Sequence, residues 1–144
     1  MARLSRLISR FELTIDGKGR LVLPSSHRPR YSDGAILSPR GTHIAVYEPE
    51  EWDRFIAQLT EYRVSGEIDR ETFNWITINA ADPTPDSAGR ILIPGWMREE
   101  VGLGQQVLVG GAHDYLAIYP ADYVTTVDPE IPRQAAIKMN TLGL

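Results

Sequence analysis

The stretch IDGKGRLVLP at residues 15–24 returns with the same skeleton as PDSAGRILIP at residues 85–94. Each copy has an aspartate, a glycine three residues later, an arginine directly after the glycine, three apolar residues and a proline. An arginine also stands four residues after each proline, at Arg28 and Arg98. One small unit therefore occurs twice, and such internal similarity decides the architecture before any other feature does.

The repeat continues beyond these motifs. Residues 36–37 are similar to residues 108–109, and residues 44–47 are similar to residues 116–119. In a chain of 144 residues, each copy belongs to a half of about 70 residues. Halves of that size bury little apolar surface on their own, so we expect them to share one core or to oligomerise.

The composition is that of a soluble globular protein, with 42% hydrophobic and 24% charged residues. No apolar run has the length needed to cross a bilayer, and arginines and serines interrupt the first ten residues, which argues against a secretory signal. The absence of cysteine excludes disulfides, thiol catalysis and zinc-finger sites. We therefore expect a cytoplasmic protein without a membrane partner.

Charge is distributed unevenly along the chain. The net charge is −4, but residues 1–30 carry seven basic and two acidic side chains, so that residues 31–144 carry −9. This asymmetry fits a local anion-binding face on an otherwise acidic body. A solvated basic tail would give the same count, so charge alone leaves both interpretations open.

The motif itself predicts a hairpin. Residues 11–15 alternate between apolar and polar side chains, as a half-buried strand does, and residues 19–24 are expected to be the partner strand. Asp16 and Gly19 suit a type I turn with a bulge, where glycine takes the positive φ angle. Residues 86–89 predict the same turn in the second copy, closed by Gly89.

The remaining pattern predicts further elements in chain order: a hairpin over 35–39 and 43–47, a helix from Pro49, a short helix over 69–74, a strand over 75–80, a helical turn ending at Gly102, strands over 106–110 and 115–119, and an irregular tail over 128–144. The pair Gly110–Gly111 is expected to form a bulge or turn.

Asp16 with Arg20, and Asp86 with Arg90, are the candidate functional pairs. An aspartate that accepts turn amides and then pairs with the arginine would hold the guanidinium in one orientation. A fixed planar fork matches a guanine edge or a phosphate. The alternative is an exposed salt bridge that only staples the hairpin, worth under about 1 kcal/mol. Two copies favour the functional interpretation, although both could be staples.

An enzyme is not expected. Paired aspartates from two halves suggest an acid protease, but each aspartate has an arginine four residues away that would keep it ionised. The chain has no Walker-type loop and no serine nucleophile elbow. The histidines His27, His43 and His113 show no metal-ligand spacing, so no metal or cofactor is predicted. Protonated His27, beside Arg28, is a weak candidate for a DNA-binding face.

The tandem Asp-x-x-x-Arg copies, each with its apolar-proline step and following arginine, resemble the MraZ family. The resemblance covers roughly residues 11–125 and is strongest at residues 16–24 and 86–103. It implies an α+β fold of two tandem AbrB-like, swapped-hairpin halves packed about a pseudo-twofold axis in one compact domain. The expected divisions are a first repeat over 11–60, a linking helix and strand over 61–80, a second repeat over 81–125, and terminal tails over 1–10 and 128–144.

The resemblance also implies a function. The family consists of transcriptional regulators that assemble into homo-oligomeric rings and bind double-stranded DNA at short direct repeats upstream of the division and cell-wall gene cluster. The expected location is the cytoplasm, in association with the nucleoid, and no small-molecule substrate is implied. Carried over residue by residue, the DNA-binding positions are Asp16, Lys18, Arg20, Asp86 and Arg90, supported by Gly19, Gly89, Arg28 and Arg98. Lys18 is assigned a phosphate contact.

Two alternatives remain open from the sequence. One is a divergent AbrB-like regulator or antitoxin, which usually has a single copy and a toxin-binding tail. The other is a structural ring module without DNA contacts. If the chain does bind DNA, the first copy is expected to hold phosphate more strongly, because only that copy lies in a basic segment.

Overall fold

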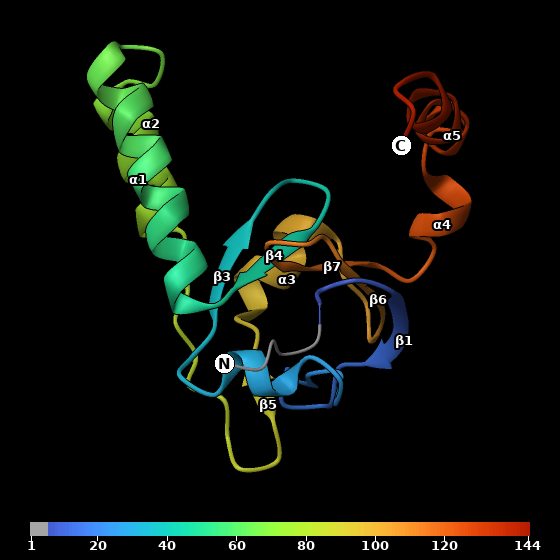
Figure 1. The fold of residues 1–144 in the computed structure, drawn as a ribbon. Helices are drawn as coiled ribbons and strands as arrows, with labels where there is room; N and C mark the ends of the chain where they lie inside the picture. Colours follow the sequence, from blue (N-terminus) through green and yellow to red (C-terminus); the bar gives the residue numbers. More distant parts are fainter. Residues whose placement is uncertain (1–5) are drawn as a thin grey trace.

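The computed structural model describes residues 6–144, which form two antiparallel sheets and several helices (Figure 1). One sheet has five strands in the order β1 (Arg10–Thr14), β6 (Gln106–Gly111), β7 (Leu116–Pro120), β4 (Ile44–Tyr47) and β3 (Ile36–Pro39). The other sheet is the β2–β5 ribbon, which consists of β2 (Arg20–Val22) and β5 (Arg90–Leu92).

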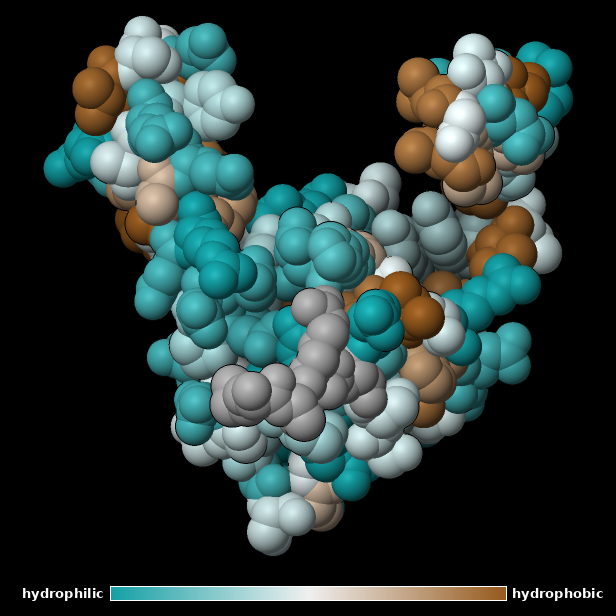
Figure 2. All heavy atoms as spheres, viewed as in Figure 1, coloured by the Kyte–Doolittle hydropathy of each residue, from teal (hydrophilic) through white to brown (hydrophobic). Residues whose placement is uncertain are grey.

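The helices include two groups that project from the sheets. The helical segments are η1 (Arg28–Tyr31), α1 (Pro49–Ser65), α2 (Arg70–Ile78), α3 (Gly95–Val101), α4 (Tyr123–Thr126) and α5 (Glu130–Thr141). Helices α1 and α2 form one arm, here called the α1–α2 arm, and α5 forms a second arm on the other side of the body (Figure 1). A hollow separates the two arms on the molecular surface (Figure 2). The β5 end of the molecule lies opposite both arms (Figure 1).

The two copies are related by a pseudo-twofold axis. Leu21 pairs with Ile91 in the β2–β5 ribbon, and these are equivalent positions of the two copies. Ala45 pairs with Ala117 in the large sheet, and these two are also equivalent. A residue that faces its own counterpart across antiparallel strands must lie on the symmetry axis. The axis therefore passes through both sheets, and the predicted α+β class is confirmed.

The prediction that residues 11–15 pair with residues 19–24 is wrong. Strand β1 pairs with β6, and β2 pairs with β5, so the two strands of the expected first hairpin belong to different sheets. Two further backbone hydrogen bonds join the two copies. Leu23 N donates to Gly89 O and Ile93 N donates to Gly19 O, both at 2.9 Å. Leu21 and Leu23 after the first motif, and Ile91 and Ile93 after the second, are buried in the shared core, which favours this pairing between the copies.

Strand β1 has only a rudimentary counterpart in the second copy. Phe11 pairs with Val109 within a five-residue ladder, whereas the equivalent Ala81 makes an isolated bridge with Leu37. Pro83 and Pro85 follow Ala81 and lack the backbone N–H that a ladder needs. The copies therefore differ at this edge of the large sheet.

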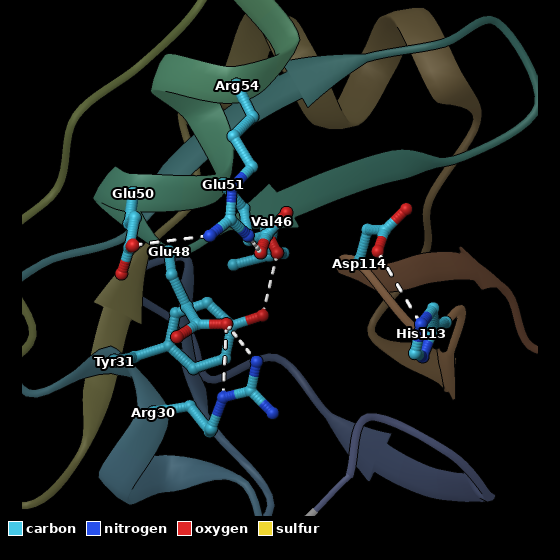
Figure 3. Close-up of polar contacts among 9 residues, drawn as sticks. All are labelled: Arg30, Tyr31, Val46, Glu48, Glu50, Glu51, Arg54, His113 and Asp114. Atoms are coloured by element: carbon cyan, nitrogen blue, oxygen red, sulfur yellow. Dashed lines mark hydrogen bonds and ion pairs between the residues drawn. The ribbon is translucent and has the colours of Figure 1, made fainter.

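One apolar core lies between the sheets and is shared by both copies. It includes the ribbon residues Leu21 and Ile91 together with side chains from β4 and β7. Tyr31 is buried in it, and its O–H donates a 2.7 Å hydrogen bond to Val46 O (Figure 3). Burial raises the pKa of Tyr31 above its usual range. Arg30 beside it pairs with Glu48 at 2.6 Å, which ties η1 to the start of α1 (Figure 3).

The expected strand over residues 75–80 is wrong, because this segment continues α2 as far as Ile78. The β-branched residues there favour a strand only weakly, and tertiary packing overrides such a preference. Asp69 caps the helix by accepting a 2.7 Å bond from Thr72 N. Phe73 packs on α1, where the Arg63 guanidinium lies 4.8 Å from its ring centroid.

The expectation of an irregular tail over residues 128–144 is also wrong, because residues 130–141 form helix α5. Pro129 and Pro132 suggest a broken segment, but they lie at the N-cap and in the first turn, where proline removes no helical hydrogen bond. Asp128 accepts a bond from Glu130 N at 2.9 Å, and Glu130 pairs with Arg133 at 2.9 Å. These local interactions start the helix.

Gly110 and Gly111 lie inside strand β6, so the predicted bulge or turn is wrong. The N-terminal segment crosses β6 at this point: Gly111 N donates to Ser9 O, and His113 N donates to Leu7 O. A Cβ at residue 111 would overlap the backbone of Leu7 and Ile8, whereas a Cβ at residue 110 meets nothing within 4 Å. Gly111 is therefore required for this close approach.

This difference gives a stability test with a control at the adjacent residue. We expect Gly111→Ala to lower the free energy of unfolding by about 1–3 kcal/mol, because the Leu7–Ile8 backbone must move away from β6. Gly110→Ala should be neutral or slightly stabilising. Denaturant unfolding followed by circular dichroism measures both variants. Equal stabilities of the two variants would contradict the assigned role of Gly111.

Candidate nucleic-acid interface

The first Asp-x-x-x-Arg motif forms a tight loop organised by one carboxylate. Asp16 Oδ1 accepts 2.9 Å bonds from the backbone N–H groups of Lys18 and Arg20, and Asp16 Oδ2 accepts a 2.8 Å bond from Arg20 Nε. Gly19 closes the loop at φ +82°, a left-handed conformation that glycine adopts without strain. The predicted turn is thus confirmed, and Arg20 leaves it with its guanidinium plane held by the aspartate.

The second motif repeats this geometry. Asp86 Oδ1 accepts 2.9 Å bonds from the N–H groups of Ala88 and Arg90, and Asp86 Oδ2 accepts a 2.7 Å bond from Arg90 Nε. Gly89 has φ +75°. The Arg90 amide lowers the pKa of Asp86 below its usual value, with smaller contributions from the guanidinium of Arg90 and the amide of Ala88. The Arg20 amide lowers the pKa of Asp16 in the same way, so both carboxylates are ionised at neutral pH.

Each arginine uses only Nε for its aspartate. Within residues 6–144, no other group accepts a hydrogen bond from Arg20 or Arg90 through the two Nη nitrogens. About a third of each arginine side chain is exposed, at 31% for Arg20 and 36% for Arg90. Two oriented Nη donors per loop therefore remain available to an external acceptor.

The two later arginines cross over to the opposite copy. Arg28 donates to Leu23 O at 2.9 Å, and a Cβ on Gly89 would overlap its side chain. Arg98 donates to Ile93 O at 3.2 Å, and its Nη2 would lie 3.0 Å from a Cβ on Gly19. The glycine of each loop thus admits the arginine of the other copy. This crossed packing connects the two loops to each other as well as to the core.

The β2–β5 ribbon presents an exposed outer face between the loops. Leu21 points into the core, so the alternating positions Arg20 and Val22 point outward, as do Arg90 and Leu92 on the other strand. Val22 is 43% exposed and Leu92 is 53% exposed. The sequence did not single out these two apolar residues. Val22 and Leu92 each stand two residues after a motif arginine, and this shared position in the repeat could have identified them.

The two loops differ in charge although they share one geometry. Lys18 occupies the loop position at which the second copy has Ala88. The arginines that follow the motifs do not distinguish the loops, because Arg28 packs over Gly89 of the second loop and Arg98 lies beside Gly19 of the first. The pseudo-symmetric face is therefore more basic on the side of the first loop.

His27 does not belong to this face, which corrects the suggestion that it contacts DNA. It is 3% exposed, its Nε2 lies 2.9 Å from Ile8 O, and its ring packs edge-on against Phe11. Among residues 6–144, no group of three or more His, Asp or Glu side chains is arranged to hold a metal ion. In the same part of the chain, no helix has both the length and the apolar character needed to cross a membrane.

Comparison with known proteins identifies relatives of this chain. The family model described as "MraZ protein, putative antitoxin-like" matches residues 7–72 and 76–125. A protein of Paenarthrobacter aurescens named Transcriptional regulator MraZ is 34% identical over 110 residues, which is 75% of this chain and 76% of that protein. A protein of the same name from Roseiflexus is 30% identical over 113 residues, covering 78% and 79% of the two chains.

A third relative is similar over nearly the whole chain. The protein of Neisseria meningitidis named Transcriptional regulator MraZ is 28% identical over 144 residues, covering 92% of this chain and 95% of that protein. The family match includes both loops and the β2–β5 ribbon. With more than half of its residues matched by the family model, this chain belongs to the MraZ family.

Proposed function

We propose that this chain is a sequence-specific DNA-binding transcriptional regulator that reads base pairs with the β2–β5 ribbon. The observation that carries the proposal is the pair of loops in which an aspartate holds Arg20 or Arg90 by Nε, while both Nη nitrogens have no acceptor within residues 6–144. Two parallel N–H donors match O6 and N7 of guanine in the major groove. A salt bridge that only stabilised the hairpin would not require an exposed guanidinium of fixed orientation in both copies.

The dimensions of the ribbon fit the major groove of DNA. Arg20 pairs with Leu92, and Arg90 pairs with Val22, so the two arginines are offset by two residues along the ribbon. That offset is roughly 7 Å along the strands, or about two base-pair steps. A two-stranded ribbon fits into the major groove of B-DNA. Val22 and Leu92 then lie beside the arginines, where apolar side chains can contact thymine methyl groups.

The two loops are expected to contribute unequally to phosphate binding. Lys18 adds a cation to the first loop, and its counterpart Ala88 adds none. We therefore assign Lys18 a phosphate contact, which fixes position on the duplex without reading sequence. The chain's net charge of −4 is compatible with this function, because only the contact face needs to be basic.

Several copies acting together would supply the affinity that a single ribbon lacks. One bidentate arginine–guanine contact discriminates by only about 1–3 kcal/mol. A ring of identical subunits on short direct repeats would bind several sites at once and gain avidity. The proposed targets are direct repeats in promoter DNA upstream of the division and cell-wall gene cluster, bound by the protein on the nucleoid in the cytoplasm.

The arginine assignment is tested by removing the forks. Arg20→Ala and Arg90→Ala should each lower affinity for the DNA upstream of the protein's own gene by roughly tenfold or more, since each loses a bidentate contact. Arg54→Ala is the control, because this exposed arginine lies on α1 and pairs with Glu50. Fluorescence anisotropy at fixed salt measures all three. Unchanged affinity in both loop variants would refute base reading by the ribbon.

The asymmetry between the loops can be tested by exchanging one residue type. Lys18→Ala should reduce the slope of log affinity against log salt by about 1 for each engaged subunit, with sequence preference retained. Ala88→Lys should increase the slope by a similar amount, because it gives the second loop the same cation. Titrations at several salt concentrations measure both slopes. Identical slopes in the wild type and both variants would show that residues 18 and 88 do not contact phosphate.

Avidity predicts a dependence on the number of direct repeats. We expect duplexes with several correctly spaced repeats to bind at least about a hundredfold more tightly than a duplex with one repeat. Scrambling the spacing while keeping the repeats should abolish most of this gain. Equal affinity for one and several repeats would contradict cooperative binding by an assembled protein.

A further inference from the structure

Helix α5 is an amphipathic helix, and within residues 6–144 only its start lies beside the body, where Ile131 lines a pocket with Tyr119 and Tyr123. None of its residues is buried, and one stripe of it is apolar over its whole length. Ile131 is 57% exposed, Met139 is 52% exposed and Leu142, directly after the helix, is 70% exposed; together with Ala135 they recur at helical spacing. Ile137 lies on another side of the same helix. Helices of about 12 residues are marginal in water without packing, so this stripe requires a surface to cover it.

The α1–α2 arm exposes a matching apolar face. No residue of α2 is buried, and Trp75 and Ile78, three residues apart on one face, are 64% and 75% exposed. A groove of about 220 Å³ opens beside this face, with Phe55, Leu59 and Ile76 on its apolar walls. An exposed tryptophan next to an apolar groove is a feature of protein–protein contact sites rather than of solvated helices.

The two apolar surfaces do not meet within one chain. The α1–α2 arm and α5 stand on opposite sides of the body (Figure 1), and the hollow between them is open at the surface (Figure 2). Apolar residues of the α5 arm face this hollow (Figure 2). One copy therefore carries two separate and different apolar surfaces.

Charge also makes these surfaces complementary. Residues 49–78, which form the α1–α2 arm, hold seven carboxylates and three arginines, a net charge of −4. Helix α5 and the residues after it, 130–144, hold Arg133, Lys138 and Glu130, a side-chain charge of +1, and Glu130 pairs with Arg133. Glu71 lies on the same side of α2 as Trp75, and Lys138 borders the apolar stripe of α5. Antiparallel packing of α5 on α2 would bring these two charges together.

We propose that the apolar stripe of α5 docks onto the Trp75–Ile78 face of the α1–α2 arm in a second copy of this chain. The proposal deepens the proposed function, since it names the surfaces through which the regulator assembles. Because the two surfaces are different, the contact is heterologous and leaves one free surface of each kind at the ends of any open chain of subunits. Such contacts close into a ring when the rotation per subunit allows it. The β2–β5 ribbon lies away from both arms and remains available to DNA.

The first experiment compares two sides of α5. Ile131→Asp combined with Met139→Asp should convert the assembled protein to monomers, as measured by light scattering after size exclusion. Ile137→Asp is the matched control, because it places the same charge on the same exposed helix outside the stripe, and it should leave the assembly intact. Circular dichroism checks that the fold is retained. Assembly that survives the double substitution, or that Ile137→Asp also abolishes, would overturn the docking of this stripe.

The second experiment uses the absence of cysteine in the chain. A Trp75→Cys variant mixed with a Met139→Cys variant should give a cross-linked dimer with a short bismaleimide reagent, while Trp75→Cys mixed with Ile137→Cys should give little. No cross-link in either mixture would refute the contact independently of any effect of aspartate on folding. A charge-reversal experiment tests the contact between Glu71 and Lys138. Glu71→Lys and Lys138→Glu should each weaken assembly, and the double variant should restore it.

These outcomes separate the docking from the DNA-binding proposal. If the wild type is a monomer, both the docking and the ring are wrong. Base reading by the ribbon would be unaffected, because the Arg20→Ala and Arg90→Ala affinities test it separately. An assembled wild type whose mass is unaffected by the α5 variants would overturn only the docking. A monomeric α5 variant should still bind a single repeat, and should lose the additional affinity for several repeats.

Discussion

The pairing of each copy's motif strand with its equivalent in the other copy is the constraint on which the structure depends. Leu21 against Ile91 sets this pairing on the pseudo-twofold axis, and Ala45 against Ala117 repeats it in the large sheet. Because each strand leaves its own loop to join the other copy, neither half has a complete core alone. The arginines Arg28 and Arg98 strengthen this interdependence by packing over the glycine of the opposite loop.

This arrangement places the two proposed interaction surfaces at opposite ends of one small molecule. The ribbon carries Arg20 and Arg90 on its outer face, two residues apart in register, so that a single rigid element orients both forks. The helical arms lie at the other end, with apolar faces that the chain itself does not cover (Figure 1). Surfaces at opposite ends of a molecule do not compete for the same partner. The proposed base contacts and the proposed self-contact are therefore compatible in one complex.

The local chemistry of the candidate site was predictable because it depends on neighbours in sequence. An aspartate four residues before an arginine, with a glycine between them, is sufficient for the carboxylate to accept the turn amides and hold Nε. The hairpin over β3 and β4 and the start of α1 were predicted for the same reason. Predictions failed where more distant contacts decided the outcome. Residues 75–78 continue α2, which lies against α1 through Phe73 and Ile76, and Gly111 is a crossing point for the N-terminal segment.

The sequence by itself determined that the chain has two copies of one unit, that each contains an aspartate-held arginine, and that the family is MraZ. These conclusions depend on residue identity and short spacing, which are printed in the chain. Only the tertiary structure decided which strand each motif strand joins, that Val22 and Leu92 accompany the arginines, that His27 is buried, and that α5 is a helix with an uncovered stripe. Those outcomes follow from long-range burial of apolar surface, which selects among partners that local sequence leaves equally acceptable.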